Sequence, residues 1–294
     1  MKSGFVAILG RPNVGKSTIL NGILKQKVSI VTDKSQTTRN NIIGIYNDEN
    51  AQIVFLDTPG IHKPTQQLGK EMNNMAYSAA HDVDVAILVV DASKPFGTGD
   101  DFIISHLDIR HCPLIIVFNK IDLARLDKAQ DLKKTYLERF PEAIFVDTVA
   151  KEHFNIDELI KEVIKLLPDG PAYYPREMIT DKDEIFQIKE IIREKVLKTL
   201  REEVPHSVAI YMDNIEWESK PMKIYASIIV ERNGQKAIVI GANGTKIKEI
   251  GTKARRDIEN YLGKHVFLNL QVKVNQDWRN EPTALKEYGY KFEK

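Results

Sequence analysis

Residues 9–18 read LGRPNVGKST, and they follow the apolar run FVAIL at residues 5–9. The stretch matches the pattern G-x-x-x-x-G-K-[ST] between a predicted strand and a predicted helix, which is the context that the pattern requires. Glycines let backbone N–H groups approach phosphate oxygens, and a helix N-terminus adds positive potential. An ordinary glycine-rich turn is the alternative, but chance would give this pattern in roughly one per cent of such chains. We therefore predict a phosphate-binding loop.

Two further motifs follow at the ends of predicted strands. Asp57-Thr58-Pro59-Gly60 offers a carboxylate that can hold a metal and a glycine N–H that can meet a γ-phosphate. Asn119-Lys120-Ile121-Asp122 offers a carboxylate that can accept two hydrogen bonds from N1–H and N2–H₂ of guanine. Adenine lacks that donor pair, so a buried Asp122 would be left unpaired against ATP. Ligands of open α/β sheets bind at the carboxyl ends of parallel strands, so these motifs predict a guanine nucleotide site.

The pattern around these motifs predicts an α/β fold for the first part of the chain. Apolar runs of strand length lie at residues 5–9, 42–46, 53–56, 85–90, 114–118 and 143–146. Helix-forming segments lie between them and beyond, at residues 16–24, 69–81, 99–111, 128–139 and 156–167. The polar turn at residues 46–50 predicts an antiparallel hairpin, and the other runs predict parallel strands covered on both faces. We expect a doubly wound sheet.

A different order follows a linker rich in proline. Three prolines and a glycine lie within residues 168–175, which ends the last helix of the first part. A charged amphipathic helix is predicted over residues 183–203, strands over 207–218 and 222–232, a helix over 245–262, and a last strand over 266–274. Residues 235–240 favour a strand by propensity. We divide the chain into domains at 1–168 and 184–276, a linker at 169–183 and a tail at 277–294.

Composition narrows the setting. The chain has 294 residues with 43% hydrophobic and 28% charged residues, as in soluble globular proteins of two domains. A single cysteine excludes an intramolecular disulfide and fits a reducing compartment, and no targeting segment opens the chain. Within residues 232–273, nine Lys and Arg face three Asp and Glu. This excess favours either a polyanion-binding surface or a solvated helix face. We expect a cytoplasmic protein.

The first-half motifs, in this order and spacing, resemble the translation-factor class of GTPases. The resemblance implies that Thr38, in the run Gln36-Thr37-Thr38-Arg39, ligates Mg²⁺ in the GTP state together with Ser17 and Asp57. It assigns Lys16 to the β- and γ-phosphates and Ala150 to the base, although Val149 stands where the family carries a serine. The implied nucleotide contacts are Gly10, Asn13, Val14, Gly15, Lys16, Ser17, Thr18, Asp57, Gly60, Asn119, Lys120, Asp122 and Ala150.

Hydrolysis is expected to be slow without help. Many GTPases carry a glutamine just after this aspartate motif to orient the attacking water, and here the position is Ile61. Asn13 matches an asparagine that helps to bind K⁺ in the Era and MnmE relatives; otherwise it is a turn residue without a ligand. A potassium ion would neutralise charge that develops between the phosphates. His62 is expected to be a mobile switch residue. Arg39 is expected to be a solvated side chain of the switch segment. The expected catalytic set is Lys16, Thr38, Gly60 and Asn13.

The second glycine loop, Gly241-Ala242-Asn243-Gly244, lacks the lysine and hydroxyl of the first. By itself GxxG is a weak signal, since ordinary helix starts share it. With apolar residues before it and a basic helix after it, the segment resembles a KH domain of type II, an α+β fold whose GXXG loop clamps about four nucleotides of RNA. The resemblance implies a short helix where propensity favours a strand. The expected RNA contacts are Ile240, Gly241, Ala242, Asn243, Gly244, Lys246, Lys248 and Arg255.

A GTPase domain followed by this KH domain resembles the Era family of bacterial ribosome-associated GTPases, within the TrmE-Era-EngA-YihA-Septin-like class. The resemblance implies a hydrolase that uses GTP or GDP with Mg²⁺, and K⁺ in addition. It implies binding near the 3′ end of 16S ribosomal RNA and a role in assembly of the small ribosomal subunit. We expect a monomer that binds no DNA and can touch the inner membrane face peripherally.

Two other classes of protein remain open from the residues alone. One is an RNA-binding structural protein with a vestigial nucleotide site, against which the complete phosphate, metal and base motifs argue. The other is a signalling GTPase at a membrane surface; no lipidation signal is present, although the basic helix at residues 245–262 could touch anionic lipid.

Overall fold

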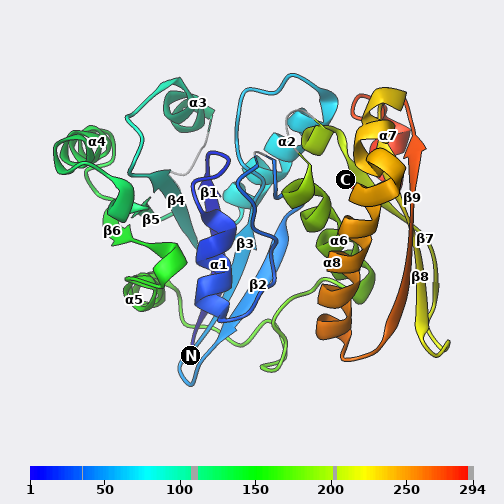
Figure 1. The fold of residues 1–294 in the computed structure, drawn as a ribbon. Coiled ribbons are helices and arrows are strands. Elements are labelled where there is room, and N and C mark those ends of the chain that lie inside the picture. Colours follow the sequence, from blue (N-terminus) through cyan, green and yellow to red (C-terminus); the bar gives the residue numbers. More distant parts are fainter. Residues whose placement is uncertain (35, 107–111, 201–203, 291–294) are drawn as a thin grey trace. The chain divides into compact units, whose positions relative to one another are not determined.

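The computed structural model describes residues 1–34, 36–106, 112–200 and 204–290, and Figure 1 shows its ribbon. The chain divides into two compact units. The first unit contains residues 1–31, 38–65 and 69–181, and the second contains residues 32–37, 66–68 and those from 182 onward. Each unit has its own sheet and its own apolar core.

The first unit is built on a six-stranded sheet with the order β2-β3-β1-β4-β5-β6. Its strands are β1 (Lys2–Gly10), β2 (Ile42–Asn47), β3 (Ala51–Asp57), β4 (Val85–Asp91), β5 (Leu114–Asn119) and β6 (Ile144–Thr148). β2 pairs antiparallel with β3, from Ile42 opposite Asp57 to Asn47 opposite Gln52. The other neighbouring strands are parallel. The predicted doubly wound sheet and the hairpin at residues 46–50 are confirmed.

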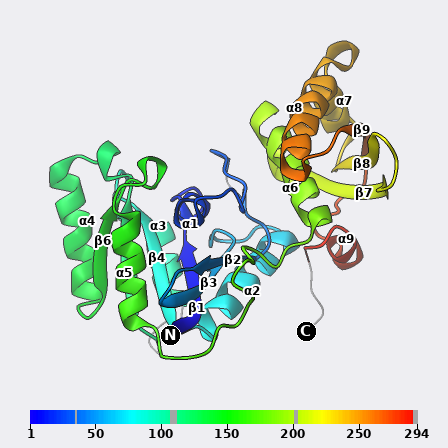
Figure 2. The ribbon, with the colours of Figure 1, turned by 90° about the horizontal axis from the view of Figure 1, so that it is seen from below.

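Alternate side chains of β1 enter two different cores. Val6 and Ile8 pack with α1 (Lys16–Leu24) and α5 (Ile156–Leu166). Ala7 and Leu9 pack with the other helices of the unit, α2 (Gln67–His81), α3 (Thr98–His106) and α4 (Leu126–Arg139). Successive side chains of a strand point to opposite faces, so the strand is buried on both faces by helices (Figure 2). The helix expected over residues 99–111 is described up to His106, and residues 107–111 lie outside the described part.

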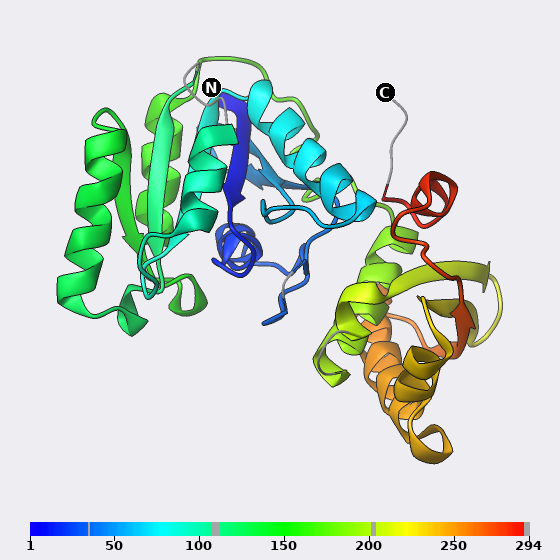
Figure 3. The same cartoon turned by 90° about the horizontal axis from the view of Figure 1, so that it is seen from above.

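The second unit has a three-stranded sheet with the order β7-β8-β9. Its strands are β7 (Ala209–Glu216), β8 (Met222–Val230) and β9 (Val266–Val274), with β7 antiparallel and β9 parallel to β8. The helices α6 (Glu184–Thr199) and α8 (Thr245–Leu262) lie side by side (Figure 3) and share a core with the sheet. The helix expected over residues 183–203 is α6, which ends at Thr199. Residues 201–203 lie outside the described part.

Residues 233–240 form a helix, α7 (Asn233–Ile240), and not the strand that propensity favours. The Gln235 side-chain oxygen accepts hydrogen bonds from the backbone N–H groups of Glu231 (2.9 Å) and Arg232 (3.1 Å), which caps the helix start. Val239 is fully buried in the core of the unit. Capping and burial together outweigh the small strand preference of this apolar segment.

The segments predicted as a linker (169–183) and as a C-terminal tail (277–294) contain residues that pack against the two units. In the segment expected as a linker, Tyr173 and Tyr174 donate their N–H groups to Gln52 Oε1 (2.6 and 2.9 Å), so most of it belongs to the first unit. In the segment expected as a tail, Trp278 is fully buried and donates from Nε1 to the Ser207 carbonyl (3.0 Å). A short helix, α9 (Pro282–Glu287), follows it.

None of the helices in the described ranges combines the length and the apolarity that a membrane-spanning helix requires.

Candidate functional site

The loop between β1 and α1 is held in a backbone conformation that excludes larger residues. Gly15 has a φ of 107°, and a Cβ atom on it would lie 2.2 Å from Asn119 Nδ2. The amide of Asn119 donates to the Val14 carbonyl (2.8 Å), which explains this close approach. The loop therefore curls tightly against the end of β5, with the α1 N-terminus directly behind it.

Lys16 is buried at the centre of this loop. Its Nζ donates to the carbonyls of Gly10 (3.1 Å) and Arg11 (2.9 Å). Burial lowers the pKa of Lys16 to about 8, and the charge of Asp57 opposes that shift only in part. A phosphate group beside the ammonium would restore its positive charge, so the loop is set to receive an anion.

The three residues predicted to hold Mg²⁺ lie together. Ser17 Oγ lies 2.8 Å from Thr38 Oγ1 and donates to Asp57 Oδ2 (2.6 Å). Ser29 Oγ, for which the sequence carried no signal, also donates to Asp57 Oδ2 (2.8 Å) and is fully buried. Burial raises the pKa of Asp57, against hydrogen bonds from Ser17 and Ser29 and the charge of Lys16.

The donor set fits a magnesium ion. Asp57 Oδ1 is buried and has no hydrogen-bond partner among the described residues. One carboxylate and two hydroxyls are oxygen ligands of the kind that Mg²⁺ takes, with phosphates and water completing its octahedron. Within the described ranges, no three His, Cys, Asp or Glu residues gather around a common point. An all-protein cage is therefore absent there, and the Asp57 cluster suits a metal shared with a nucleotide.

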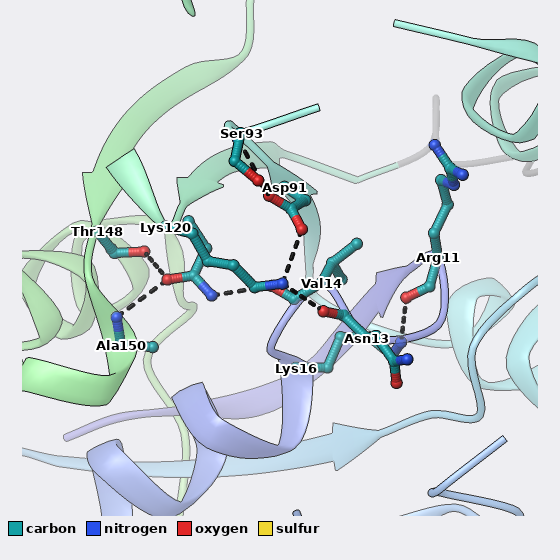
Figure 4. A network of polar contacts seen from close by, with 10 residues as sticks. Arg11, Asn13, Val14, Lys16, Asp91, Ser93, Lys120, Thr148 and Ala150 are labelled. Carbon is teal, nitrogen blue, oxygen red and sulfur yellow. Dashed lines mark hydrogen bonds and ion pairs between the residues drawn. The ribbon is translucent and has the colours of Figure 1, made fainter. Parts of the chain in front are cut away.

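The opposite end of the site is built around Asn119 and Lys120. Figure 4 shows Lys120 near Thr148 and Ala150. Asn119 Oδ1 accepts from the Ala150 N–H (2.9 Å) and from Thr148 Oγ1 (3.1 Å). The Asn119 side chain thus ties the loop after β6 to the phosphate loop. This explains how Ala150 is positioned although the expected serine is absent.

Lys120 crosses the site from β5 to the phosphate loop. Its Nζ donates to the Asn13 carbonyl and to Asp91 Oδ2, each at 2.7 Å (Figure 4). Burial would raise the pKa of Asp91, but hydrogen bonds from Lys120 and Ser93 and the Lys120 charge hold it below its usual value. The stem of Lys120 is thereby fixed between β5 and the phosphate loop.

Asp122 differs from the expectation of a buried carboxylate, because its side chain is exposed in the short turn η1 (Ile121–Leu123). Two hollows flank the loop. One of about 710 Å³ is lined by Thr18 and Ala150 among others, and one of about 500 Å³ is lined by Asn13, Val14 and Lys120 among others. Neither lining includes Asp122.

The segment after β3 packs tightly on the phosphate loop. A Cβ atom on Gly60 would lie 2.7 Å from the Pro12 backbone, so only glycine fits. Ile61 is buried and its N–H donates to the Gly10 carbonyl (3.1 Å), which places an apolar side chain directly after the segment Asp57–Gly60. His62 Nδ1 lies 3.0 Å from the Gly60 carbonyl oxygen.

Arg39 corrects the sequence-based expectation. It was expected to be a solvated switch side chain, but it is only 1% exposed. A buried guanidinium is costly to leave unpaired, so burial implies a structural role within its segment.

A network that the sequence did not indicate supports the phosphate loop from α3. The buried Asp100 accepts from Arg11 Nη1 (3.1 Å) and the Gly97 N–H (3.0 Å) through Oδ2. Its Oδ1 accepts from the Tyr136 hydroxyl (3.2 Å). Since the Arg11 carbonyl accepts from Lys16, this carboxylate is linked through one residue to the phosphate-binding lysine.

The second glycine loop lies in the turn η4 (Ala242–Gly244) between α7 and α8. Gly241 and Gly244 have φ values of 73° and 75°, and Asn243 has a φ of 51°. A Cβ atom on Gly244 would meet nothing within 4 Å, whereas one on Gly241 would lie 2.8 Å from Lys246 Cγ. The loop therefore has an open side along Gly244.

The residues predicted to contact RNA are partly gathered there. Ala242, Asn243 and Lys248 are exposed, and Ile240 and Lys246 are half-buried. Arg255 is exposed but lies three turns further along α8, about 16 Å from Gly244. Arg255 can therefore contact only a more distant part of a strand clamped at the loop.

Two family models match the chain. Residues 5–120 match a model described as a 50S ribosome-binding GTPase, and residues 203–279 match a KH domain model. The curated protein GTPase Era of Leuconostoc citreum is 50% identical over 295 residues, covering 99% of this chain and 97% of that protein.

Two solved structures resemble the whole chain. One is a variant of Aquifex aeolicus Era bound to GDP and AlF₄⁻, with 39% identity and a TM-score of 0.94 over 99% of this chain and 100% of that one. The other is Era in complex with MgGDPNP and nucleotides 1506–1542 of 16S ribosomal RNA, with 40% identity, the same TM-score and the same coverage.

Proposed function

The chain belongs to the Era family of GTPases, and we propose that it is a GTP-hydrolysing switch that binds the 3′ region of 16S ribosomal RNA during small-subunit assembly. The observation that carries the enzymatic half is that Ser17, Thr38 and Asp57 lie together, while the second carboxylate oxygen of Asp57 is buried and has no hydrogen-bond partner among the described residues. The relative whose structure contains nucleotides 1506–1542 of 16S ribosomal RNA supports the RNA half.

The first unit would hold GTP from both ends. Lys16 and the N–H groups of the phosphate loop would bind the phosphates, and Ser17, Thr38 and Asp57 would hold Mg²⁺. The bound metal neutralises phosphate charge as the γ-phosphoryl group leaves. Asp122 would accept hydrogen bonds from guanine, with Asn119, Lys120 and Ala150 shaping the base pocket.

Turnover is proposed to be slow in the absence of a partner or cation. The apolar Ile61 is buried, so it cannot orient a water molecule as a glutamine would. Asn13, at the exposed tip of the phosphate loop, is our candidate for supporting a K⁺ ion. Hydrolysis measured in equimolar KCl and NaCl tests this: faster turnover in K⁺ that disappears in Asn13→Ala is expected, and equal rates would remove K⁺ from the mechanism.

The second unit would clamp RNA at the loop 241–244. Left-handed glycines bring the backbone close to the strand, and Lys246 and Lys248 follow on the first turns of α8. About four nucleotides would be held there.

The nucleotide state is proposed to control RNA binding. Loss of the γ-phosphate would release Thr38 and the segment after Asp57, as in other GTP switches. RNA affinity measured with a non-hydrolysable GTP analogue and with GDP tests this coupling. Equal affinities in the two states would contradict it.

One experiment tests the function as a whole. The wild-type protein, loaded with a non-hydrolysable GTP analogue, is crosslinked to cellular RNA and the contacts are mapped to the nucleotide. We expect crosslinks near the 3′ end of 16S ribosomal RNA that disappear in Gly244→Asp. Crosslinks spread over unrelated RNAs would contradict the proposed target.

Two finer expectations also belong to this proposal. The protein would act as a monomer, and the basic face of α8 would allow peripheral contact with anionic lipid at the cell membrane. Sedimentation with and without acidic vesicles tests both.

A further inference from the structure

A third hollow lies in the second unit, far along the fold from the glycine loop. It has a volume of about 770 Å³, and its lining includes Trp217, Glu218, Lys220, Pro221, Lys264 and His265. We call it the tip pocket. It is formed by the turn between β7 and β8 and the turn between α8 and β9. The loop 241–244 precedes the start of α8, and the turn between α8 and β9, which helps to line the pocket, follows the end of that helix (Figure 1). Because α8 has 18 residues, about 27 Å separate the two ends.

Trp217 gives the tip pocket an aromatic face. The chain has two tryptophans, and their surroundings differ sharply. Trp278 is fully buried, whereas Trp217 is 39% exposed. Phe267, the second residue of β9, is 46% exposed and lies near the same end of the sheet. An exposed aromatic ring offers a flat face on which an unpaired base can stack.

The charge around Trp217 is mainly positive. Lys220 and Lys264 line the pocket with one acidic lining residue, Glu218, and the His265 ring lies 3.6 Å from Glu259 outside the lining. The neighbouring Lys223 and Glu216 pair with each other (2.9 Å) and add no net charge. In the described residues Lys220 and Lys264 form no ion pair with an acidic side chain, so their charges are available to a ligand.

We propose that the tip pocket is a second RNA contact, which takes one unpaired base on the Trp217 indole and its flanking phosphates on Lys220 and Lys264. Aromatic stacking beside cations is the way in which proteins hold single-stranded nucleic acid. The inference rests on the proposed RNA function of the second unit. It assigns to the pocket a segment of the same RNA outside the roughly four nucleotides at loop 241–244.

Tryptophan fluorescence tests the contact directly in the full-length protein. The probe is an RNA fragment corresponding to nucleotides 1506–1542, and acrylamide quenching is measured with and without it. The Trp217 signal is obtained by subtracting that of Trp217→Phe, which retains Trp278. We expect RNA to quench Trp217 and to shield it from acrylamide. Unchanged emission and accessibility at saturating RNA would overturn the proposal.

Affinity and its salt dependence test the roles of the side chains. Trp217→Ala should weaken RNA binding about tenfold, and Trp217→Phe should retain most of the affinity because a stacking face remains. Lys220→Ala with Lys264→Ala should reduce the slope of log K against log salt by about 1.4, the value for two phosphate contacts on a single strand. Lys161→Ala, an exposed lysine of α5 in the other unit, is the matched control.

The outcomes separate this inference from the proposed function. If Gly244→Asp abolishes RNA binding while the tip-pocket variants bind with wild-type affinity and slope, the second contact is wrong and the RNA function stands. If these variants instead lose binding of a ribosomal protein and keep RNA affinity, the pocket is a protein interface and the inference is overturned. If wild type does not bind the fragment, the proposed function itself fails.

Discussion

The two glycine loops of this chain use the same residue for different physical reasons. In the loop 10–17, glycine is required because there is no room: a Cβ atom on Gly10 would lie 2.4 Å from the Val89 carbonyl oxygen, and one on Gly15 would lie 2.2 Å from Asn119 Nδ2. In the loop 241–244, a Cβ atom on Gly244 would meet nothing within 4 Å, and glycine serves the left-handed backbone. The first loop is packed from several sides, and the second is open.

This difference explains how each loop can recognise its ligand. The first has its hydrogen-bonding partners in place before a ligand arrives, with Asn119 and Lys120 at the end of β5 and Asp100 on α3 holding it. A site that is already ordered loses little entropy when it binds a small charged molecule. The second loop presents its backbone on an open side along Gly244. This suits a nucleic-acid strand, which has a repeating backbone that can be held at many positions.

The largest expected effect tests the specificity of the packed site. Asp122→Asn should lower GTP affinity about a thousandfold, because two charge-assisted hydrogen bonds to guanine are lost, and it should admit xanthine nucleotides. Binding of fluorescent GTP and XTP analogues measures both. Asp127→Asn, the same change on the exposed start of α4, is the control and should bind GTP like wild type. Unaltered base preference in Asp122→Asn would break the assignment of the base pocket.

The next effect tests the open loop. Gly244→Asp should weaken RNA binding at least about a hundredfold, since a carboxylate replaces open space beside the RNA backbone and a non-glycine residue takes a left-handed φ. GTP affinity should not change. Gly234→Asp adds the same charge in the same unit, also with nothing within 4 Å, and should bind RNA with nearly wild-type affinity. Equal losses of GTP and RNA affinity would break the division into two sites.

A smaller effect tests whether nucleotide binding by the first loop depends on the ion pair between Asp100 and Arg11. Asp100→Asn should lower GTP affinity about tenfold, because Arg11 loses a buried ionic partner next to the carbonyl that holds Lys16. Asp101→Asn on the same helix removes a more exposed pair with Arg139 (2.6 Å) and should have little effect. Calorimetric binding and thermal unfolding of both variants separate loss of affinity from loss of stability. Equal GTP affinities for the two variants would show that the loop does not depend on Asp100.

The smallest effect concerns the proton uptake that accompanies nucleotide binding at Lys16. Burial lowers the pKa of Lys16 to about 8, so the free protein carries a neutral lysine above that pH. Phosphate binding raises the pKa again, so nucleotide binding must take up protons there, and affinity falls as pH rises. Proton uptake should increase from about 0.2 at pH 7.5 to about 0.8 at pH 8.5. Calorimetry in buffers of different ionisation enthalpy measures it, and a constant value would mean that Lys16 stays charged in the free protein.

The sequence by itself determined the order of the elements and the principal chemistry. Continuous apolar runs of strand length between amphipathic helices are local patterns, and the glycine, aspartate and asparagine motifs are contiguous, so both are visible without coordinates. The helix at residues 233–240 was visible only through the KH resemblance, because its cap at Gln235 and the burial of Val239 outweigh local propensity.

Tertiary structure alone decided which side chains support the site. Asp100 meets Arg11 across 89 positions and Asn119 meets Val14 across 105, and no local pattern encodes such pairs. Arg39 and Trp278 lie in polar stretches that predict exposure, yet both are buried. A residue's hydropathy fixes the free energy of burying it, but only the packing of distant segments determines whether a partner is there to offset that cost.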